Sequence, residues 1–310
     1  MTRFGDFEPL CKNTPSYPWC NLFYRQLQRH SPDVLQGASA DPKTAPVGIN
    51  PVCGIPFVAV DGSLANIANI IACGLSVIFL VYLTWATSRR KAAVGRIELR
   101  LFLILYLLTL PLQILTTGSF IEQGSTALTV LTAIHAGLVA ATFWALLANG
   151  IVSTQIVEDG TLSAIIPFTF FIAAFFAATT YIALDVGFTF TSALGPSNPP
   201  ESLHSVPLFV LTTIWPGAAA LLYFALMLYI VLGVLNEVRP MWFYVLAAVL
   251  FILSQLDYFL LNKVICKGVS SHRLDGSFVA TFLETAAVGV LYLAWRSITE
   301  EDWDDTNYLQ

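Results

Sequence analysis

The chain has 310 residues, of which 56% are hydrophobic and 11% charged, and its mean hydropathy is +0.71. Because charged residues normally make up about a quarter of a soluble domain, this composition excludes a soluble globular fold and indicates an integral membrane protein. The formal net charge of -5 is mild, and no basic arm is present that would follow phosphates. Nucleic acid is therefore excluded as a partner.

Residues 1–61 are rich in proline, polar groups and short aromatic runs, without the apolar core of a cleaved signal peptide. We expect a luminal amino-terminal segment here. Seven apolar stretches follow, each long enough to cross a hydrocarbon core about 30 Å thick. They are residues 64–86, 97–117, 126–151, 162–184, 206–235, 241–261 and 277–296. The sequence predicts an all-α membrane protein with seven transmembrane helices in residues 62–296 and an acidic tail at 297–310.

Proline lies inside three of these stretches, at Pro111, Pro167 and Pro216. Since proline removes a backbone donor, we expect kinks in the second, fourth and fifth spans.

The distribution of cationic residues predicts the orientation. Only Lys43 lies within about 20 residues before the first span. Five cationic residues follow that span: Arg89, Arg90, Lys91, Arg96 and Arg100. The positive-inside rule therefore places the amino end in the lumen and the carboxyl end in the cytosol. The loop at residues 262–276 argues against this orientation with three cations, but the first span usually dominates.

Four cysteines lie outside the spans and face the oxidising lumen in this orientation: Cys11, Cys20, Cys53 and Cys266. Four cysteines allow three pairings, and the sequence alone selects none of them. We favour Cys11 with Cys20, which would close a short proline-containing loop, and Cys53 with Cys266. The absence of a CxxC spacing favours structural disulfides over redox chemistry.

Six polar residues fall in the luminal halves of the predicted spans: Asn66, Asn69, Gln113, His135, Asp257 and Glu284. At about 1.5 Å per residue, His135 and Glu284 lie at similar depths. Because ionisable groups in a membrane are expensive without a partner or a wet cavity, we hypothesise that these two pair, or line one pocket with Asp257 near its mouth. Internal packing, docking of another membrane protein's polar groups and small-ligand binding all remain open as roles.

Catalytic and cofactor motifs are absent from the sequence. The histidines have no HxxxH spacing, and neither a G-x-S-x-G motif nor a P-loop occurs. We therefore expect no enzyme, no metal and no cofactor. A seven-helix receptor or small-ligand transporter is the alternative function, although the third span lacks a D/E-R-Y-like triplet and the last span lacks NPxxY.

Several short motifs occur in order along the chain: FGDFEPLCKNTPSYPWC, KAAVGRIE, FWALLANG followed by EDGT, VICKG with HRLDGSF, and WRSITEEDWDD. In these motifs the chain resembles the fungal chitin synthase export chaperone family, from residue 4 to residue 305. The resemblance implies a non-catalytic protein of the endoplasmic reticulum membrane, surrounded by membrane lipid. It would bind newly made chitin synthase and allow that client to leave the compartment, supporting cell-wall chitin synthesis.

The acidic tail is the remaining candidate site. Its residues are Glu300, Glu301, Asp302, Trp303, Asp304 and Asp305. Such a run is usually only a solvated end. On the cytosolic side it would instead be able to contact the client or vesicle coat machinery as an export signal.

Overall fold

The computed structural model describes residues 3–14, 16–35, 66–89, 95–118, 120–156, 158–268 and 274–299, with only the backbone of Cys266 and Lys267. Seven helices in these ranges are long and apolar enough to span a membrane. They are α3 (Ile67–Arg89), α4 (Arg96–Thr117), α5 (Thr126–Ser153), α6 (Leu162–Phe188), the fifth span (Val206–Val234), the sixth span (Val238–Ile265) and α11 (Ser277–Ile298). The predicted all-α fold with seven spans is confirmed, with ends shifted by a few residues.

The fifth and sixth spans contain wider π-helical turns. The fifth comprises α7 (Val206–Phe209), a π turn at Val210–Ile214, α8 (Trp215–Tyr229) and a second π turn at Ile230–Val234. The sixth comprises α9 (Val238–Leu256), a π turn at Asp257–Leu261 and the start of α10 (Asn262–Gly268). The first π turn ends at Ile214, two residues before Pro216, whose missing N–H leaves a carbonyl without its usual donor. By contrast, α4 and α6 continue through Pro111 and Pro167.

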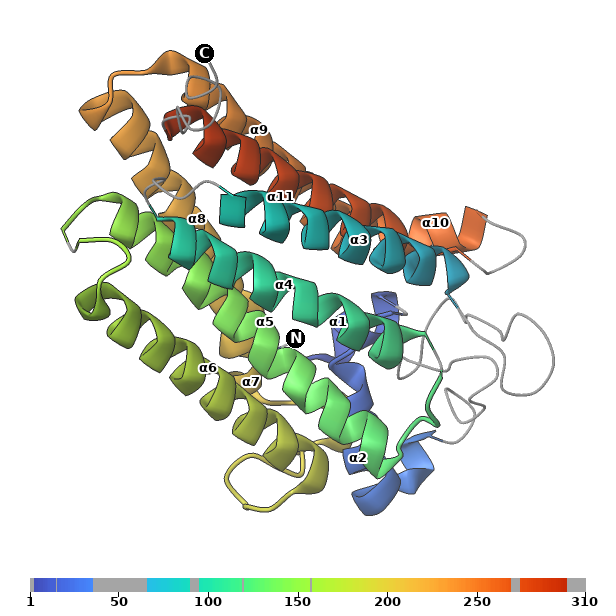
Figure 1. Ribbon diagram of the computed structural model, residues 1–310. Coiled ribbons are helices and arrows are strands. Elements are labelled where there is room, and N and C mark those ends of the chain that lie inside the picture. Colours follow the sequence, from blue (N-terminus) through green and yellow to red (C-terminus); the bar gives the residue numbers. More distant parts are fainter. Residues whose placement is uncertain are drawn as a thin grey trace, which may run out of the picture.

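The spanning helices form a ring with one weak seam. Helix α5 packs on α4, α6 and α8, while α3 packs between α4 and α11, and α11 packs on α9 (Figure 1). The ring therefore runs α8–α5–α4–α3–α11–α9, with α6 outside α5. Helices α8 and α9 are neighbours in sequence, yet α9 contacts α11 far more extensively than it contacts α8. The seam between α8 and α9 is consequently the loosest part of the ring.

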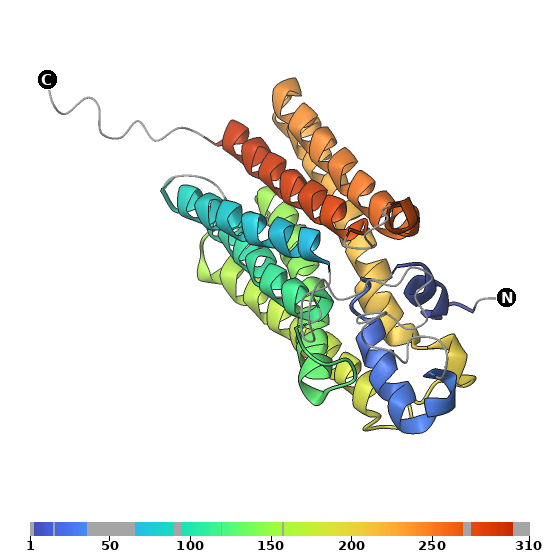
Figure 2. The same cartoon turned by 90° about the vertical axis from the view of Figure 1, so that its right-hand side faces the viewer.

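The amino-terminal residues 3–14 and 16–35, which we call the cap, cover one end of this ring (Figure 2). The cap contains α1 (Glu8–Asn13), α2 (Cys20–His30) and a 3₁₀ turn at Pro32–Leu35. On α2 the residues Cys20, Phe23 and Leu27 recur at helical spacing and are fully or almost fully buried. They belong to a second hydrophobic core that includes alanines of α5 and α6, so the cap is packed into the bundle.

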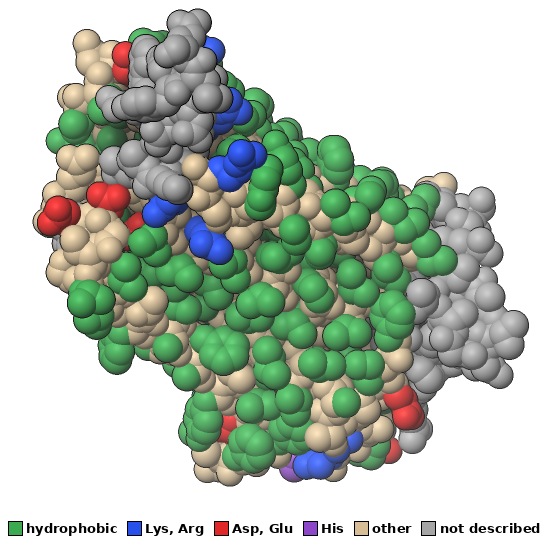
Figure 3. Space-filling model, viewed as in Figure 1, with side chains coloured by type: hydrophobic (Ala, Val, Ile, Leu, Met, Phe, Trp, Pro, Cys, Tyr) green, Lys and Arg blue, Asp and Glu red, His purple; other side chains and the backbone are tan. Residues whose placement is uncertain are grey.

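Apolar side chains cover the middle of the outer surface (Figure 3). On α6, for example, Ile166, Phe170 and Tyr181 are exposed. Helices α5 and α11 are the most buried spans, whereas α6 is the least buried. A broad exposed apolar band around a ring with a buried centre is what a bilayer requires of a multi-pass protein.

Candidate functional site

A partly open cavity of about 410 Å³ lies beneath the cap. Its walls come from the cap, α4, α5, the fifth and sixth spans, and α11. Most of the wall is apolar, and the exposed Gly217 of α8 forms part of it. The cavity therefore reaches the α8–α9 seam, where the ring is most weakly packed. A volume of this size is within the range of protein ligand pockets.

Besides several hydroxyl groups, the lining includes four side chains with an amide, imidazole or carboxyl group, each from a different helix: Gln113 of α4, His135 of α5, Gln255 of α9 and Glu284 of α11. Gln255 Nε2 donates to Glu284 Oε1 at 2.8 Å. Gln113 Nε2 donates to Thr281 Oγ1 at 2.9 Å. His135 Nδ1 lies 3.2 Å from Thr116 Oγ1. Each polar group is thus held by a neighbouring helix, which fixes its direction in the wall.

The structure brings His135 and Glu284 to the same cavity but gives them different partners. Among the described residues no hydrogen bond joins them directly. Their side chains face the cavity from α5 and α11, two spans that do not pack extensively on each other. Of the six polar residues singled out from the sequence, Gln113 is the third that lines this space.

The two asparagines of the predicted polar group lie outside the cavity lining and connect helices. Asn69 of α3 accepts a hydrogen bond from Thr281 Oγ1 at 2.8 Å through its Oδ1 and donates to Thr117 Oγ1 at 3.3 Å through its Nδ2. Asn66 Nδ2 donates to Ser277 Oγ at 3.0 Å. These bonds tie α3 to α4 and α11, which is a packing role.

Asp257 also lies away from the cavity lining, in the π turn of the sixth span, where it is buried. A second buried acid, Asp275, precedes α11 and was not predicted as a site. Asp275 Oδ1 accepts the Ser277 N–H at 3.0 Å. Burial raises the pKa of Asp275 although Ser277 donates to it. This burial could not be predicted from the sequence, because an acid in a polar loop normally faces water.

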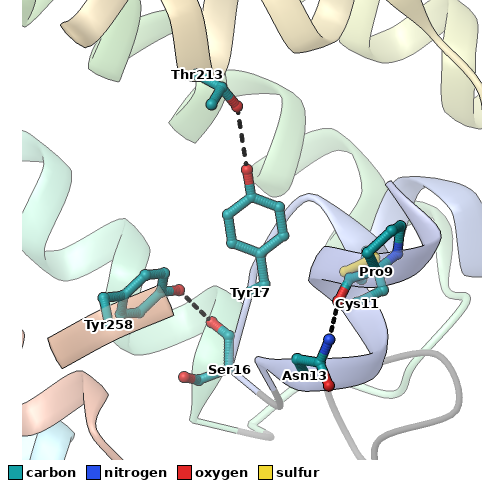
Figure 4. The surroundings of a disulfide bond; sticks show 8 residues. Pro9, Cys11, Asn13, Ser16, Tyr17, Thr213 and Tyr258 are labelled. Atoms are coloured by element: carbon teal, nitrogen blue, oxygen red, sulfur yellow. Dashed lines mark hydrogen bonds between the residues drawn. A yellow bond between two sulfur atoms is a disulfide. The ribbon is translucent and has the colours of Figure 1, made fainter. Parts of the chain in front are cut away.

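Three cap residues that were not predicted as site residues from the sequence reach the cavity wall: Tyr17, Pro18 and Trp19. The Tyr17 hydroxyl lies 3.5 Å from Thr213 Oγ1, and Tyr258 donates to the backbone oxygen of Ser16 at 2.9 Å (Figure 4). The Trp19 ring lies 5.2 Å from the His135 ring. Burial raises the pKa of Tyr17 to about 12, so its hydroxyl stays neutral. The aromatic run SYPW within a short cysteine loop is the signal that would have identified them.

A disulfide joins Cys11 to Cys20, with 5.8 Å between the two Cα atoms. It closes the loop that carries Tyr17 and Trp19, so the bond holds both rings against the bundle. Cys53 and the side chain of Cys266 lie outside the described residues, as does the acidic tail at residues 300–305. Within the described ranges, no group of three or more His, Cys, Asp or Glu side chains is arranged to hold a metal ion.

In comparison with known protein families, residues 3–307 match the family described as chitin synthase export chaperone. The chain is 29% identical to a chitin synthase export chaperone of Chaetomium globosum, over 96% of this chain and 83% of that protein. It is 28% identical to one of Neurospora crassa, over 97% and 78%, and 27% identical to one of Fusarium oxysporum, over 97% and 84%. No solved structure matches the chain significantly.

Proposed function

The chain belongs to the chitin synthase export chaperone family, and from this premise we propose that it binds newly made chitin synthase in the endoplasmic reticulum membrane and allows it to leave. The protein is a non-catalytic, multi-pass membrane chaperone. Its client's role in making chitin connects it to the fungal cell wall.

The cavity beneath the cap is the site that we assign to the client. Its polar side chains sit inside a membrane-spanning bundle, next to the seam between α8 and α9. A membrane client with polar groups in its own spans is prone to aggregation until those groups are covered. A cavity with polar groups in an apolar wall, reached from between two loosely packed helices, provides such cover.

We further propose that the cap faces the lumen and the acidic tail the cytosol. The disulfide in the cap supports this orientation, because disulfides form in oxidising compartments. Arg89, Arg96, Arg239 and Arg296 lie at the opposite ends of their spans, as the positive-inside rule requires. The test is a cysteine introduced at Glu201, exposed to a membrane-impermeant thiol reagent in sealed vesicles. Labelling of this cysteine from the cytosolic side alone would show that the proposed orientation is the wrong way round.

The acidic tail is proposed as a contact for the client or the coat machinery. The test is a chain truncated after Thr299, which should accumulate its client in the endoplasmic reticulum. Normal export by the truncated chain would remove the tail from the proposal.

The assignment of the cavity to the client is tested by a substitution that makes the cavity smaller. In fungal cells that lack the chaperone, we expect tagged chitin synthase to stay in the endoplasmic reticulum and the intact chain to restore its export. The variant Gly217→Trp introduces an indole at the cavity wall, where a Cβ has no neighbour within 4 Å. It should fail to restore export.

The matched control is Gly74→Trp on α3. A Cβ at Gly74 also meets nothing within 4 Å, but this glycine does not line the cavity. It should restore export fully. Normal export by a folded Gly217→Trp chain would contradict the assignment of the cavity to the client.

A further inference from the structure

The cavity contains a carboxylate without a cationic partner. Glu284 is one of about thirty described residues that line the cavity. None of these lining residues is a lysine or an arginine. Its one hydrogen-bond partner in the described ranges is Gln255, which donates to Oε1. Glu284 Oε2 receives no hydrogen bond from the described residues. Glu284 is therefore the one acidic side chain among the described lining residues, and its Oε2 is open to a further donor.

The other polar groups of the wall do not balance this carboxylate. Gln113 Nε2 already donates to Thr281, and Thr281 donates onward to Asn69. His135 is joined through Nδ1 to Thr116 rather than to Glu284. Within a membrane-spanning bundle, an acid normally has a cation, a donor or a wet cavity nearby. The donors that surround the cavity are largely engaged with the chaperone's own helices.

The position of Glu284 makes it accessible to another membrane segment. Its partner Gln255 belongs to α9, which forms one side of the α8–α9 seam, and Gly217 on α8 forms the other side. Gly217 is exposed and has open space at its Cβ. A long side chain that enters between α8 and α9 would thus reach a mostly apolar wall that also carries the Glu284–Gln255 pair.

We propose that Glu284 recognises a basic side chain, lysine or arginine, in a membrane-spanning segment of the client. A basic residue in a span is costly to insert into a bilayer, and its long apolar stem suits the apolar wall. In the cavity its head would meet a carboxylate held in place by Gln255. This inference rests on the assignment of the cavity to the client and adds which client residue enters it.

The test is co-purification of the full-length chaperone with tagged chitin synthase from membranes of cells that express both. Glu284→Gln keeps the shape of the side chain and removes its charge. We expect it to lower the amount of captured client about tenfold or more, as the loss of a charge-assisted hydrogen bond implies. Asp257→Asn, the same class of change at a buried acid away from the cavity, should leave capture unchanged. Matching thermal unfolding midpoints show that both variants are folded.

A charge exchange identifies the source of the cation. Each lysine and arginine in the client's spans is replaced by glutamine, and one replacement should reproduce the loss seen with Glu284→Gln. The pair Glu284→Lys with client Lys or Arg→Glu at that position should recover capture. If no client replacement reproduces the loss, or the exchange fails to recover it, the cation belongs to a lipid amine or another molecule and the inference is overturned.

The Gly217→Trp variant separates this inference from the proposed function. If Gly217→Trp abolishes capture while folded Glu284→Gln captures normally, the cavity remains the client site and only recognition of a basic residue fails. If both variants capture normally, the cavity assignment fails together with the inference.

Discussion

The two ends of the bundle are stabilised in different ways. At the cap end, a disulfide, a buried aromatic and aliphatic core and hydrogen bonds from the cap to several spans hold the structure together. At the opposite end, two hydrogen bonds join the start of α4 to the connection between α5 and α6. The Gly95 N–H donates to Asp159 Oδ2 at 2.9 Å, and the Gly160 N–H donates to Glu98 Oε1 at 3.2 Å. Both ends therefore contain a packed hydrophobic core, and they differ in what is added to it: a disulfide and a cap at one end, and individual polar contacts between connections at the other.

The cap connects neighbouring helices at its end of the bundle. Cap residues Asn21 and Gln26 donate to backbone oxygens of Thr116 and Val186, at the ends of α4 and α6. The cap therefore joins helices from opposite sides of α5 above the cavity. Near the opposite end α8 and α9 meet, with the Tyr223 and Tyr244 rings 6.4 Å apart, although in total α9 contacts α8 much less than it contacts α11. The disulfide-closed cap thus lies above a ring whose weakest packing is the seam between α8 and α9 at its side.

Removal of the disulfide should have the largest effect. Cys11→Ser with Cys20→Ser releases a short loop, and chain entropy predicts a loss of about 2–3 kcal/mol of unfolding free energy. The thermal unfolding midpoint in lipid nanodiscs should fall, and a reductant should lower the midpoint of the unaltered chain but not that of the double variant. An unchanged midpoint would mean that the cap is held without its disulfide.

A larger side chain in the packed region beneath the cap should have the second-largest effect on stability. A Cβ at Gly187 of α6 would lie 2.6 Å from Thr129 Cγ2 of α5, so Gly187→Val should cost about 1–3 kcal/mol. The same substitution at Gly74, where a Cβ meets nothing within 4 Å, should cost far less. Comparison of the two midpoints measures how tightly the cap end is packed, and equal midpoints would contradict the packed core.

At the opposite end a single polar contact should matter less. Asp159→Ala removes the acceptor of the Gly95 N–H, and we expect a loss of about 1 kcal/mol. Asp159→Asn retains a side-chain oxygen and should lose less. If Asp159→Ala destabilised the protein as much as loss of the disulfide does, the proposed difference between the two ends would be wrong.

The smallest effect should be the pH dependence of the stability that Asp6 contributes at the cap. Burial opposes ionisation of Asp6, but hydrogen bonds from the Arg3 N–H and from His204 outweigh it and lower the pKa of Asp6 below its usual 3.8. Its contribution to stability is therefore fully present above pH 3.8 and is lost as the pH falls through the lower folded value. The midpoint difference between the unaltered chain and Asp6→Asn should be constant at higher pH and shrink on acidification. A difference that grows on acidification would contradict this sign.

Much of the membrane architecture was readable in the sequence. A span must present about 20 consecutive apolar residues, so composition along the chain was enough to find seven of them. The same local reasoning identified Cys11 and Cys20 as a candidate pair, because residues nine apart around a proline-containing segment readily meet. It also identified Glu284 and His135, because an ionisable residue is conspicuous in an apolar stretch.

The tertiary structure decided which of those residues act together. Asn69 and Gln113 look alike in the sequence, yet Asn69 connects three helices and Gln113 lines the cavity. Which way a side chain faces depends on the rotation of its helix against its neighbours, and seven nearly uniformly apolar helices carry little amphipathic pattern to reveal that rotation. The insertion of Tyr17 and the loose α8–α9 seam likewise arise from contacts between segments far apart in the chain, which no local pattern encodes.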